Sequence, residues 1–199
     1  MKPRTDSPSR PEASARIIVG LTGPNASGKS EVATHLQRLG FACHSLSDIV
    51  REEASVRGLD HSRVHLIAVG NELRRAAGPG VLASRIRSRL AQRDVVDSIR
   101  NPAEVEELRR ESGFHLLGLD ASVELRFQRS RLRGRVGDGV SLEDFMTAEE
   151  AENTADPAAQ QLRATLQLAD VTLVNDGELP SLLHQVDRTL LHWSAIRRE

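Results

Sequence analysis

The feature that most constrains this chain is the segment GPNASGKS at residues 23–30. It fits the pattern G-x-x-x-x-G-K-[ST], whose glycines leave room for backbone N–H groups to point inward at a polyphosphate. An apolar, β-branched run precedes it at Ile17–Thr22, and apolar residues at helical spacing follow it in Lys29–Leu39. We therefore expect a buried strand, a phosphate-binding loop and a helix, in that order.

Residue types within this loop predict ATP as the ligand, with Mg²⁺. In such loops the lysine, here Lys29, reaches the β- and γ-phosphates, and the hydroxyl that follows it, here Ser30, ligates the metal. Lys2 and Lys29 are the only lysines, so arginine supplies the other twenty-five of the 27 basic residues. A lysine retained here indicates a site that arginine would not serve. The residues predicted to contact ATP in the loop are Gly23, Pro24, Asn25, Ala26, Ser27, Gly28, Lys29, Ser30 and Glu31.

Strand and helix patterns alternate along the whole chain, which predicts a parallel sheet covered by helices on both faces. The expected strands are Ile17–Thr22, Phe41–Leu46, Asp94–Ile99, Phe114–Leu119 and Val171–Val174. The expected helices include Lys29–Leu39, Val64–Ala77, Val81–Ala91, Pro102–Arg110, Val123–Leu132, Pro157–Leu168 and Leu179–Trp193. The predicted fold class is α/β, a P-loop NTPase with three αβα layers and a five-stranded parallel sheet.

The predicted organisation is a single domain over residues 16–199. It contains a helical acceptor-binding insert at roughly 47–92 and a lid at roughly 134–156, a polar stretch broken by glycines. Residues 1–15 are rich in Pro, Ser and charge, and we expect them to be a disordered tail.

The overall composition indicates which classes of binding partner to expect. A formal net charge of -1 gives no electrostatic reason to expect nucleic acid or an anionic membrane. No apolar run approaches the ~20 residues that span a bilayer, and the tail lacks the apolar stretch of a signal peptide. We expect a cytoplasmic protein, and apolar positions on Leu179–Trp193 would allow a homodimer. Cys43 is the only cysteine, which excludes disulfides within one chain, and we expect it to be a small buried residue.

Arginines and aspartates follow the predicted strands, at the sheet edge where ligands of such folds bind. Asp48 and Arg51 follow the second strand, and Asp97 and Arg100 follow the third. Asp97 is predicted to hold magnesium through water, with a helix-capping or purely structural aspartate as the alternative. Further arginines gather on and after the helix that follows the fourth strand: Arg126, Arg129, Arg131, Arg133 and Arg135. Helical spacing puts Arg126, Arg129 and Arg133 on one face, although a solvated basic face would give the same pattern.

This pattern favours a small kinase among P-loop proteins. No N-K-x-D-like segment for guanine recognition occurs, and the chain is short for a motor ATPase. In a small kinase, catalysis consists mostly of positioning and of neutralising charge with Arg, Lys and Mg²⁺. The residues predicted to act in catalysis are Lys29, Asp48, Arg100, Arg129, Arg133 and Arg135, and the predicted metal ligands are Ser30 and Asp97.

Several segments resemble known kinase families. The opening IIVGLTGPNASGKS looks like that of dephospho-CoA kinases and nucleoside monophosphate kinases. Asp48-Ile-Val-Arg51 resembles the G-D-x-x-R segment of the latter, and Asp97-Ser-Ile-Arg100 resembles their D-G-F-P-R segment. The resemblance implies that Arg51 and Arg100 hold the acceptor's phosphate, with Asp48 orienting the attacking oxygen.

A second likeness concerns the adenine end of the site. Ala169-Asp-Val-Thr-Leu-Val-Asn-Asp-Gly177 is similar to the A-D-x-x-I-x-N-D-G stretch of dephospho-CoA kinases, which implies that Asn175, Asp176 and Gly177 lie close to ATP. The chain from Arg16 onward also looks like a group of dephospho-CoA-kinase-like and adenylate-kinase-like proteins that includes the kinase-like domain fused to some deoxycytidylate deaminases. The segments VVDSIRNPAEVEELR and ADVTLVNDG carry most of that likeness.

Two departures from these families separate the possible functions. The D-x-P-L-L-x-E motif of dephospho-CoA kinases is replaced by DSIRNPAEVEEL, and the lid segment Phe145–Thr154 is acidic where related kinases often carry arginines. The sequence therefore predicts an ATP-dependent phosphotransferase acting on a (deoxy)nucleoside monophosphate or a similar small phosphorylated acceptor. The alternatives are a dephospho-CoA kinase and a non-catalytic nucleotide-binding regulatory module.

Overall fold

Five parallel strands form the centre of the molecule. The computed structural model describes residues 16–134 and 141–195, so the predicted tail at residues 1–15 and the predicted catalytic Arg135 lie outside the described residues. The strands are β1 (Ile17–Thr22), β2 (Ala42–Ser45), β3 (Arg93–Asp97), β4 (Phe114–Asp120) and β5 (Val171–Val174). They lie in the order β2-β3-β1-β4-β5, and every neighbouring pair is parallel. The predicted α/β fold with a five-stranded parallel sheet is confirmed.

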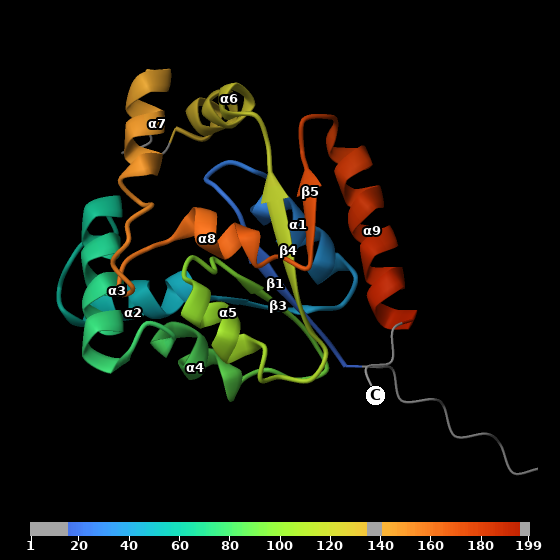
Figure 1. Ribbon diagram of the computed structural model, residues 1–199, viewed down its shortest axis with the longest axis horizontal. Helices are drawn as coiled ribbons and strands as arrows, with labels where there is room; N and C mark the ends of the chain where they lie inside the picture. Colours follow the sequence, from blue (N-terminus) through green and yellow to red (C-terminus); the bar gives the residue numbers. More distant parts are fainter. Residues whose placement is uncertain (1–15, 135–140, 196–199) are drawn as a thin grey trace, which may run out of the picture.

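Helices cover both faces of this sheet (Figure 1). They are α1 (Lys29–Arg38), α2 (Leu46–Val56), α3 (Arg63–Ala77), α4 (Val81–Arg87), α5 (Pro102–Leu108), α6 (Val123–Arg133), α7 (Leu142–Glu150), α8 (Leu162–Gln167) and α9 (Leu179–Ala195). Figure 1 shows α6 and α7 at the end to which the arrowheads of β4 and β5 point. This end is where the carboxyl ends of parallel strands meet, and where ligands of open α/β sheets bind.

Two hydrophobic clusters form the core, one on each face of the sheet. Alternate residues of β1 enter different clusters: Ile18 packs with residues of α2–α5, whereas Val19 packs with residues of α1 and α9. Strands buried on both faces produce the continuous apolar runs seen in the sequence. Trp193, near the end of α9, is 4% exposed and its ring stacks on His115 with centroids 4.6 Å apart. The last helix is therefore packed against the domain.

The segment 141–161 differs from the sequence prediction. Residues 142–150 form α7, a helix that the sequence reading missed, with Ser141 and Asp144 in a capping box and Phe145 buried. The helix predicted at Pro157–Leu168 begins only at Leu162. The residues before it are held in another conformation because Asn101 Nδ2 donates to the carbonyls of Pro157 and Ala159, at 2.7 and 2.8 Å.

Cys43 is exposed, so the prediction that it is buried was wrong. It lies in β2, the strand at the edge of the sheet, whose residues are exposed or half-buried. Within residues 16–134 and 141–195, no helix combines the length and the apolar character that crossing a bilayer requires. Leu191 on α9 is largely exposed, and a homodimer through this helix stays a prediction.

Candidate active site

The phosphate loop joins β1 to α1 and requires glycine at two positions. Gly23 has φ +132, and a Cβ there would lie 1.9 Å from the carbonyl oxygen of Leu119. Gly28 has φ +107, and a Cβ there would lie 2.4 Å from Asn175 Nδ2. Both glycines adopt backbone conformations that side chains disfavour, and both leave room for a close neighbour. The motif glycines are therefore explained by the loop's conformation and packing.

Lys29 lies at the start of α1 with its ammonium group against the loop. Its Nζ donates to the carbonyls of Gly23 and Pro24, at 2.7 Å each. The pKa of Lys29 is lowered from 10.5 to about 7, chiefly by burial and next by the positive charge of Arg100. Asp97 opposes this shift, and Arg133 and Arg126 add to it. Positive charges from the loop after β3 and from α6 thus converge on Lys29, and a bound polyanion would complement them.

Three arginines of α6 face the phosphate loop and the end of β5, as their helical spacing suggests. Arg133 Nη2 donates to Asn25 Oδ1 at 2.9 Å, and Arg126 Nη1 lies 3.5 Å from the Asn25 carbonyl oxygen. Arg129 Nη2 donates to the Asn175 carbonyl at 2.9 Å. Its other terminal nitrogen, Nη1, is buried and has no hydrogen-bond partner among the described residues. Arg129 therefore holds a buried donor available to an anion or to an acceptor atom.

The predicted adenine segment holds the loop and α6 in place. The Asn175 side chain is buried, and its Nδ2 donates to the Ser27 carbonyl at 2.9 Å. Asp176 Oδ1 accepts the backbone N–H of Ser122, the N-cap residue of α6, at 2.7 Å. Gly177 lies at the surface, where a Cβ would meet no atom within 4 Å. Asn175 and Asp176 thus have defined contacts in the protein itself, while adenine binding by Asn175, Asp176 and Gly177 stays a prediction.

Asp97 ends β3 at the same edge of the sheet. Its Oδ1 is buried and has no hydrogen-bond partner among the described residues. Ser30 and Glu31 are exposed in the first turn of α1. No group of three or more His, Cys, Asp or Glu side chains in the described part of the chain could hold a metal. Mg²⁺ fits this set, because it binds through one or two protein oxygens together with substrate phosphates.

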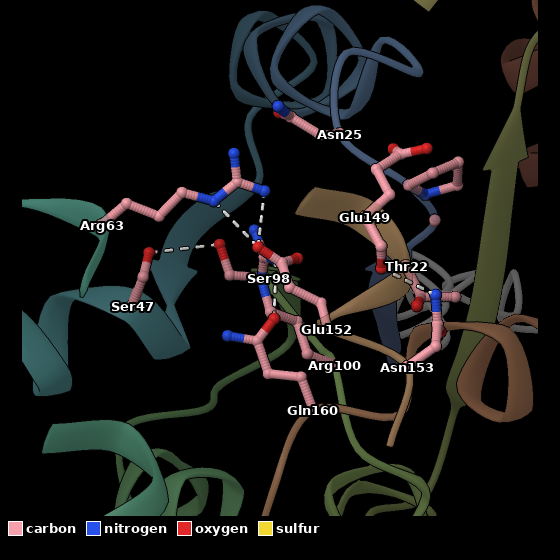
Figure 2. Close-up of polar contacts among 12 residues, drawn as sticks. Thr22, Asn25, Ser47, Arg63, Ser98, Arg100, Glu149, Glu152, Asn153 and Gln160 are labelled. Carbon is pink, nitrogen blue, oxygen red and sulfur yellow. Dashed lines mark hydrogen bonds and ion pairs between the residues drawn. The ribbon is translucent and has the colours of Figure 1, made fainter. Parts of the chain in front are cut away.

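The acceptor residues expected after β2 are bonded to one another. Arg51 Nη1 donates to Asp48 Oδ1 at 2.6 Å and to Ser47 Oγ at 3.1 Å. Ser47 Oγ in turn lies 3.2 Å from Ser98 Oγ (Figure 2). Ser98 has φ +67, an uncommon backbone conformation for a residue with a Cβ. The Asp48 side chain is exposed and that of Arg51 is half-buried, so solvent reaches both members of the pair.

A buried carboxylate that the sequence reading did not single out binds two arginines. Arg63 Nε and Nη2 donate to Glu152 Oε1 at 2.9 and 2.5 Å, and Arg100 Nη1 donates to Glu152 Oε2 at 3.1 Å. Figure 2 shows Arg63 and Arg100 reaching Glu152 from different elements, with Gln160 also bonded to Arg100. The sequence analysis did not predict a site role for Arg63. Its place as the first residue of α3 was an available signal, because a positive charge at a helix N-terminus opposes the helix dipole unless a negative charge neutralises it.

A second carboxylate of the same segment reaches the donor side. Glu149, in the last turn of α7, forms an ion pair with Arg126, whose side chain is 9% exposed. Two carboxylates of the predicted lid thus form ion pairs with arginines. Glu149 pairs with Arg126, which lies beside the phosphate loop, and Glu152 pairs with Arg100, which follows β3.

The sheet order and the loop after β1 define a P-loop α/β protein with a kinase-like fold. Residues 19–152 match the family model described as AAA domain. Among solved structures, protein TT1252 from Thermus thermophilus is similar over 89% of this chain and 98% of its own, with TM-score 0.58 and 22% identity. Shikimate kinase from Bacteroides thetaiotaomicron is similar over 89% of this chain and 99% of its own, with TM-score 0.59 and 12% identity. These likenesses concern the fold.

Sequence relatives identify the family more narrowly. A UPF0200 protein of Pyrococcus abyssi is 31% identical over 180 residues, which cover 86% of this chain and 94% of the relative. A UPF0200 protein of Methanosarcina barkeri is 37% identical over 141 residues, 68% of this chain and 76% of the relative. A UPF0200/UPF0201 protein of Archaeoglobus fulgidus is 32% identical over 182 residues, and the match spans only 55% of that protein. The chain belongs to the UPF0200 family and carries an AAA domain.

Proposed function

We propose that this protein is an ATP-dependent phosphotransferase whose acceptor is a (deoxy)nucleoside monophosphate or a similar small phosphorylated molecule. The observation that carries the proposal is the convergence of positive charge on Lys29, whose pKa is lowered to about 7 by burial and by Arg100, with smaller effects of Arg133 and Arg126. A triphosphate bound at the loop would supply the missing negative charge and restore the ammonium form of Lys29.

On the donor side, backbone N–H groups of residues 23–30 would bind the phosphates at the N-terminus of α1. Lys29 would exchange the carbonyls of Gly23 and Pro24 for phosphate oxygens. Arg126, Arg129 and Arg133 lie on the α6 face toward the loop, where they would stabilise charge on the transferring group.

Magnesium would be held by the Ser30 hydroxyl and, directly or through water, by Asp97. The unpartnered buried Oδ1 of Asp97 supports this assignment, because a buried carboxylate oxygen without a partner is costly unless a ligand completes it. When bound, Mg²⁺ neutralises charge on the β- and γ-phosphates.

On the acceptor side, Arg51 and Arg100 would hold the acceptor's phosphate, and Asp48 would orient the attacking hydroxyl. In the free protein each of these side chains is bonded to a partner of opposite charge, Asp48 with Arg51 and Arg100 with Glu152. Bidentate guanidinium groups suit both carboxylates and phosphates, so a phosphate can replace the carboxylate partner.

ADP formation across a panel of acceptors tests this function. The panel contains ATP·Mg²⁺ with ribo- and deoxynucleoside monophosphates and with dephospho-CoA, and Lys29→Ala serves as the blank. Stimulation by one monophosphate is the expected result, and stimulation by dephospho-CoA alone would replace the proposed acceptor. ATP binding without ADP formation on any member would favour a nucleotide-binding regulatory module instead.

A further inference from the structure

Arg100 is held at its backbone and at one nitrogen of its side chain. Its backbone N–H donates to the buried Glu104 carboxylate at 2.9 Å, and its carbonyl accepts the backbone N–H of Gln161 at 2.8 Å. Its Nη1 donates to Glu152 Oε2 at 3.1 Å and to Gln160 Oε1 at 3.0 Å, as Figure 2 shows. These contacts fix both the position of the residue and the orientation of its guanidinium group.

Both side chains that hold Nη1 come from the loop at residues 152–161. Asn101, the residue after Arg100, is 1% exposed and donates through Nδ2 to two carbonyls of this loop. The loop is also closed near its two ends by an isolated antiparallel bridge. Because none of these contacts involves the Gln160 side chain, replacing that side chain should leave the loop in place.

The other edge of the Arg100 guanidinium group is open to a ligand. Nε and Nη2 lie on this edge with their N–H bonds parallel, the arrangement that binds a carboxylate or a phosphate through two hydrogen bonds. Arg63 and Arg74 use the same two nitrogens toward Glu152 and Glu104. In Arg100 these two nitrogens have no hydrogen-bond partner within the described part of the chain, and the side chain is 30% exposed.

The charge of Arg100 lies close to the phosphate loop. Burial is the main cause of the lowered pKa of Lys29, and the positive charge of Arg100 is the next. In P-loop proteins this lysine contacts the β- and γ-phosphates. An oxyanion on the open edge of Arg100 would therefore lie near the phosphates of bound ATP, which phosphoryl transfer to an acceptor requires.

We propose that Gln160 and Glu152 are positioning residues, which hold Nη1 of Arg100 so that its Nε and Nη2 receive the acceptor's phosphate. This inference rests on the proposed function and deepens it, because it assigns the atoms of Arg100 that bind the phosphate and the residues that orient them. For Arg100, the phosphate does not have to replace Glu152, since the two oxyanions bind different nitrogens. Gln160 acts through Arg100, so its side chain should not matter once Arg100 is replaced.

The test is titration of inorganic phosphate into the full chain, with the phosphate loop saturated by a non-hydrolysable ATP analogue and Mg²⁺. Gln160→Met removes the acceptor oxygen and keeps the length of the side chain. It should weaken phosphate binding by about tenfold, the effect of losing one hydrogen bond to a charged group. Gln160→Glu keeps an oxygen in the same place, so its phosphate affinity should be closer to that of the wild type. Equal losses in the two variants, or a wild type that binds no phosphate, would overturn the inference.

A double-mutant cycle separates positioning from a general structural role. Arg100→Lys keeps the positive charge but has no guanidinium edge, so adding Gln160→Met to it should cost no further phosphate affinity. The same loss with and without Arg100 would show that Gln160 does not act through Arg100. Gln161→Ala is the matched control: the Gln161 side chain makes no hydrogen bond among the described residues, so phosphate affinity should equal that of the wild type.

A second measurement uses the wild-type chain and so does not depend on how well Gln160→Met folds. The Nε–H resonance of Arg100 is assigned by its absence from the NMR spectrum of Arg100→Lys. It should shift when phosphate is added to the analogue-saturated protein, because the phosphate accepts this N–H. A resonance that does not respond at saturating phosphate would contradict the assignment of this edge.

Failure of the proposed function is distinguishable from failure of this inference. Phosphate binding that depends on Gln160 and Arg100, without ADP formation on any acceptor, would retain the positioning role and remove the kinase. With an acceptor that stimulates ADP formation, Gln160→Met should raise the KM for the acceptor and leave the KM for ATP unchanged. An unchanged KM for the acceptor would retain the kinase and overturn the positioning role.

Discussion

Glu104 in α5 supports the loop that carries Arg100, and its removal should destabilise the whole domain. Its side chain is 0% exposed, and Oε1 accepts hydrogen bonds from Arg74 Nε and Nη2 at 3.1 and 2.8 Å. Its Oε2 accepts the backbone N–H groups of Arg100 and Asn101, at 2.9 and 3.1 Å. Glu104→Ala would leave the buried charge of Arg74 unpaired and two N–H groups without an acceptor.

Breaking a buried ion pair from one side costs about 3–5 kcal/mol. A loss of about 4 kcal/mol in the free energy of unfolding corresponds to a fall in Tm of roughly 8–16 °C for a domain of this size, at 2–4 °C per kcal/mol. Urea unfolding followed by circular dichroism measures the free energy, and a thermal scan measures Tm. The free energy of ATP binding should change less than the free energy of unfolding, since the phosphate loop lies between β1 and α1 and not beside α5.

Glu107→Ala is the matched control, because Glu107 lies on the same helix and also pairs with arginines. Those pairs, with Arg87 and Arg110, are partly exposed, so the expected cost is about 0–1 kcal/mol. The reasoning would be refuted if the two variants lost the same free energy, since burial would then not be what makes the Arg74–Glu104 pair important.

Three further predictions concern the nucleotide site. At pH 8, ATP binding should take up about one proton, because the pKa of Lys29 is about 7 in the free protein and bound phosphates favour the ammonium form. ATP affinity should therefore fall as the pH rises above 7. Equal calorimetric heats of ATP binding at pH 8, in two buffers of different ionisation enthalpy, would contradict the proton uptake. Gly28→Ala should weaken ATP binding by about tenfold or more, because its Cβ would lie 2.4 Å from Asn175 Nδ2, whereas Gly40→Ala, also at positive φ but with open space, should leave it unchanged. Asp97→Asn should lower the apparent Mg²⁺ affinity of the ATP complex by about 10–100-fold, measured by magnesium titration of ATP binding, and an unchanged affinity would remove Asp97 from the metal site.

The parts of the fold that the sequence predicts well are those fixed by local pattern. β1 has the predicted bounds, Ile17–Thr22, because every residue of the strand is buried and its apolar run is continuous. The loop that follows requires glycine at 23 and 28 for reasons of backbone conformation, which makes its motif readable without a structure. Strand bounds elsewhere shift by a few residues, as at β3, which ends at Asp97 because Ser98 turns the chain with φ +67.

The parts that sequence reasoning missed depend on contacts between distant segments. Residues 157–161 look helical but are held by Asn101, which lies more than fifty residues away. Cys43 looks buried in a strand, yet its exposure depends on β2 being at the edge of the sheet. α7 carried a readable signal, since Ser141 and Asp144 have capping-box spacing before Phe145.

The same distinction applies to the candidate site. Lys29 and Arg100 come after strands and Asp97 ends one, so their position at the sheet edge could be predicted from the order of elements alone. The bridge from Arg63 through Glu152 to Arg100 could not, because its members come from three segments whose approach is set only by the tertiary fold.

The most direct test of the account is to follow the γ-phosphoryl group of ATP itself. The protein is incubated with Mg²⁺ and ATP labelled with ¹⁸O on the γ-phosphate, together with the acceptor that best stimulates ADP formation, and the products are analysed by mass spectrometry. The account predicts that the label appears on the phosphorylated acceptor, and that Lys29→Ala and Arg51→Ala abolish or strongly reduce the transfer. Label found only in inorganic phosphate, or remaining in ATP with every acceptor tested, would contradict the claim that this protein is a phosphotransferase.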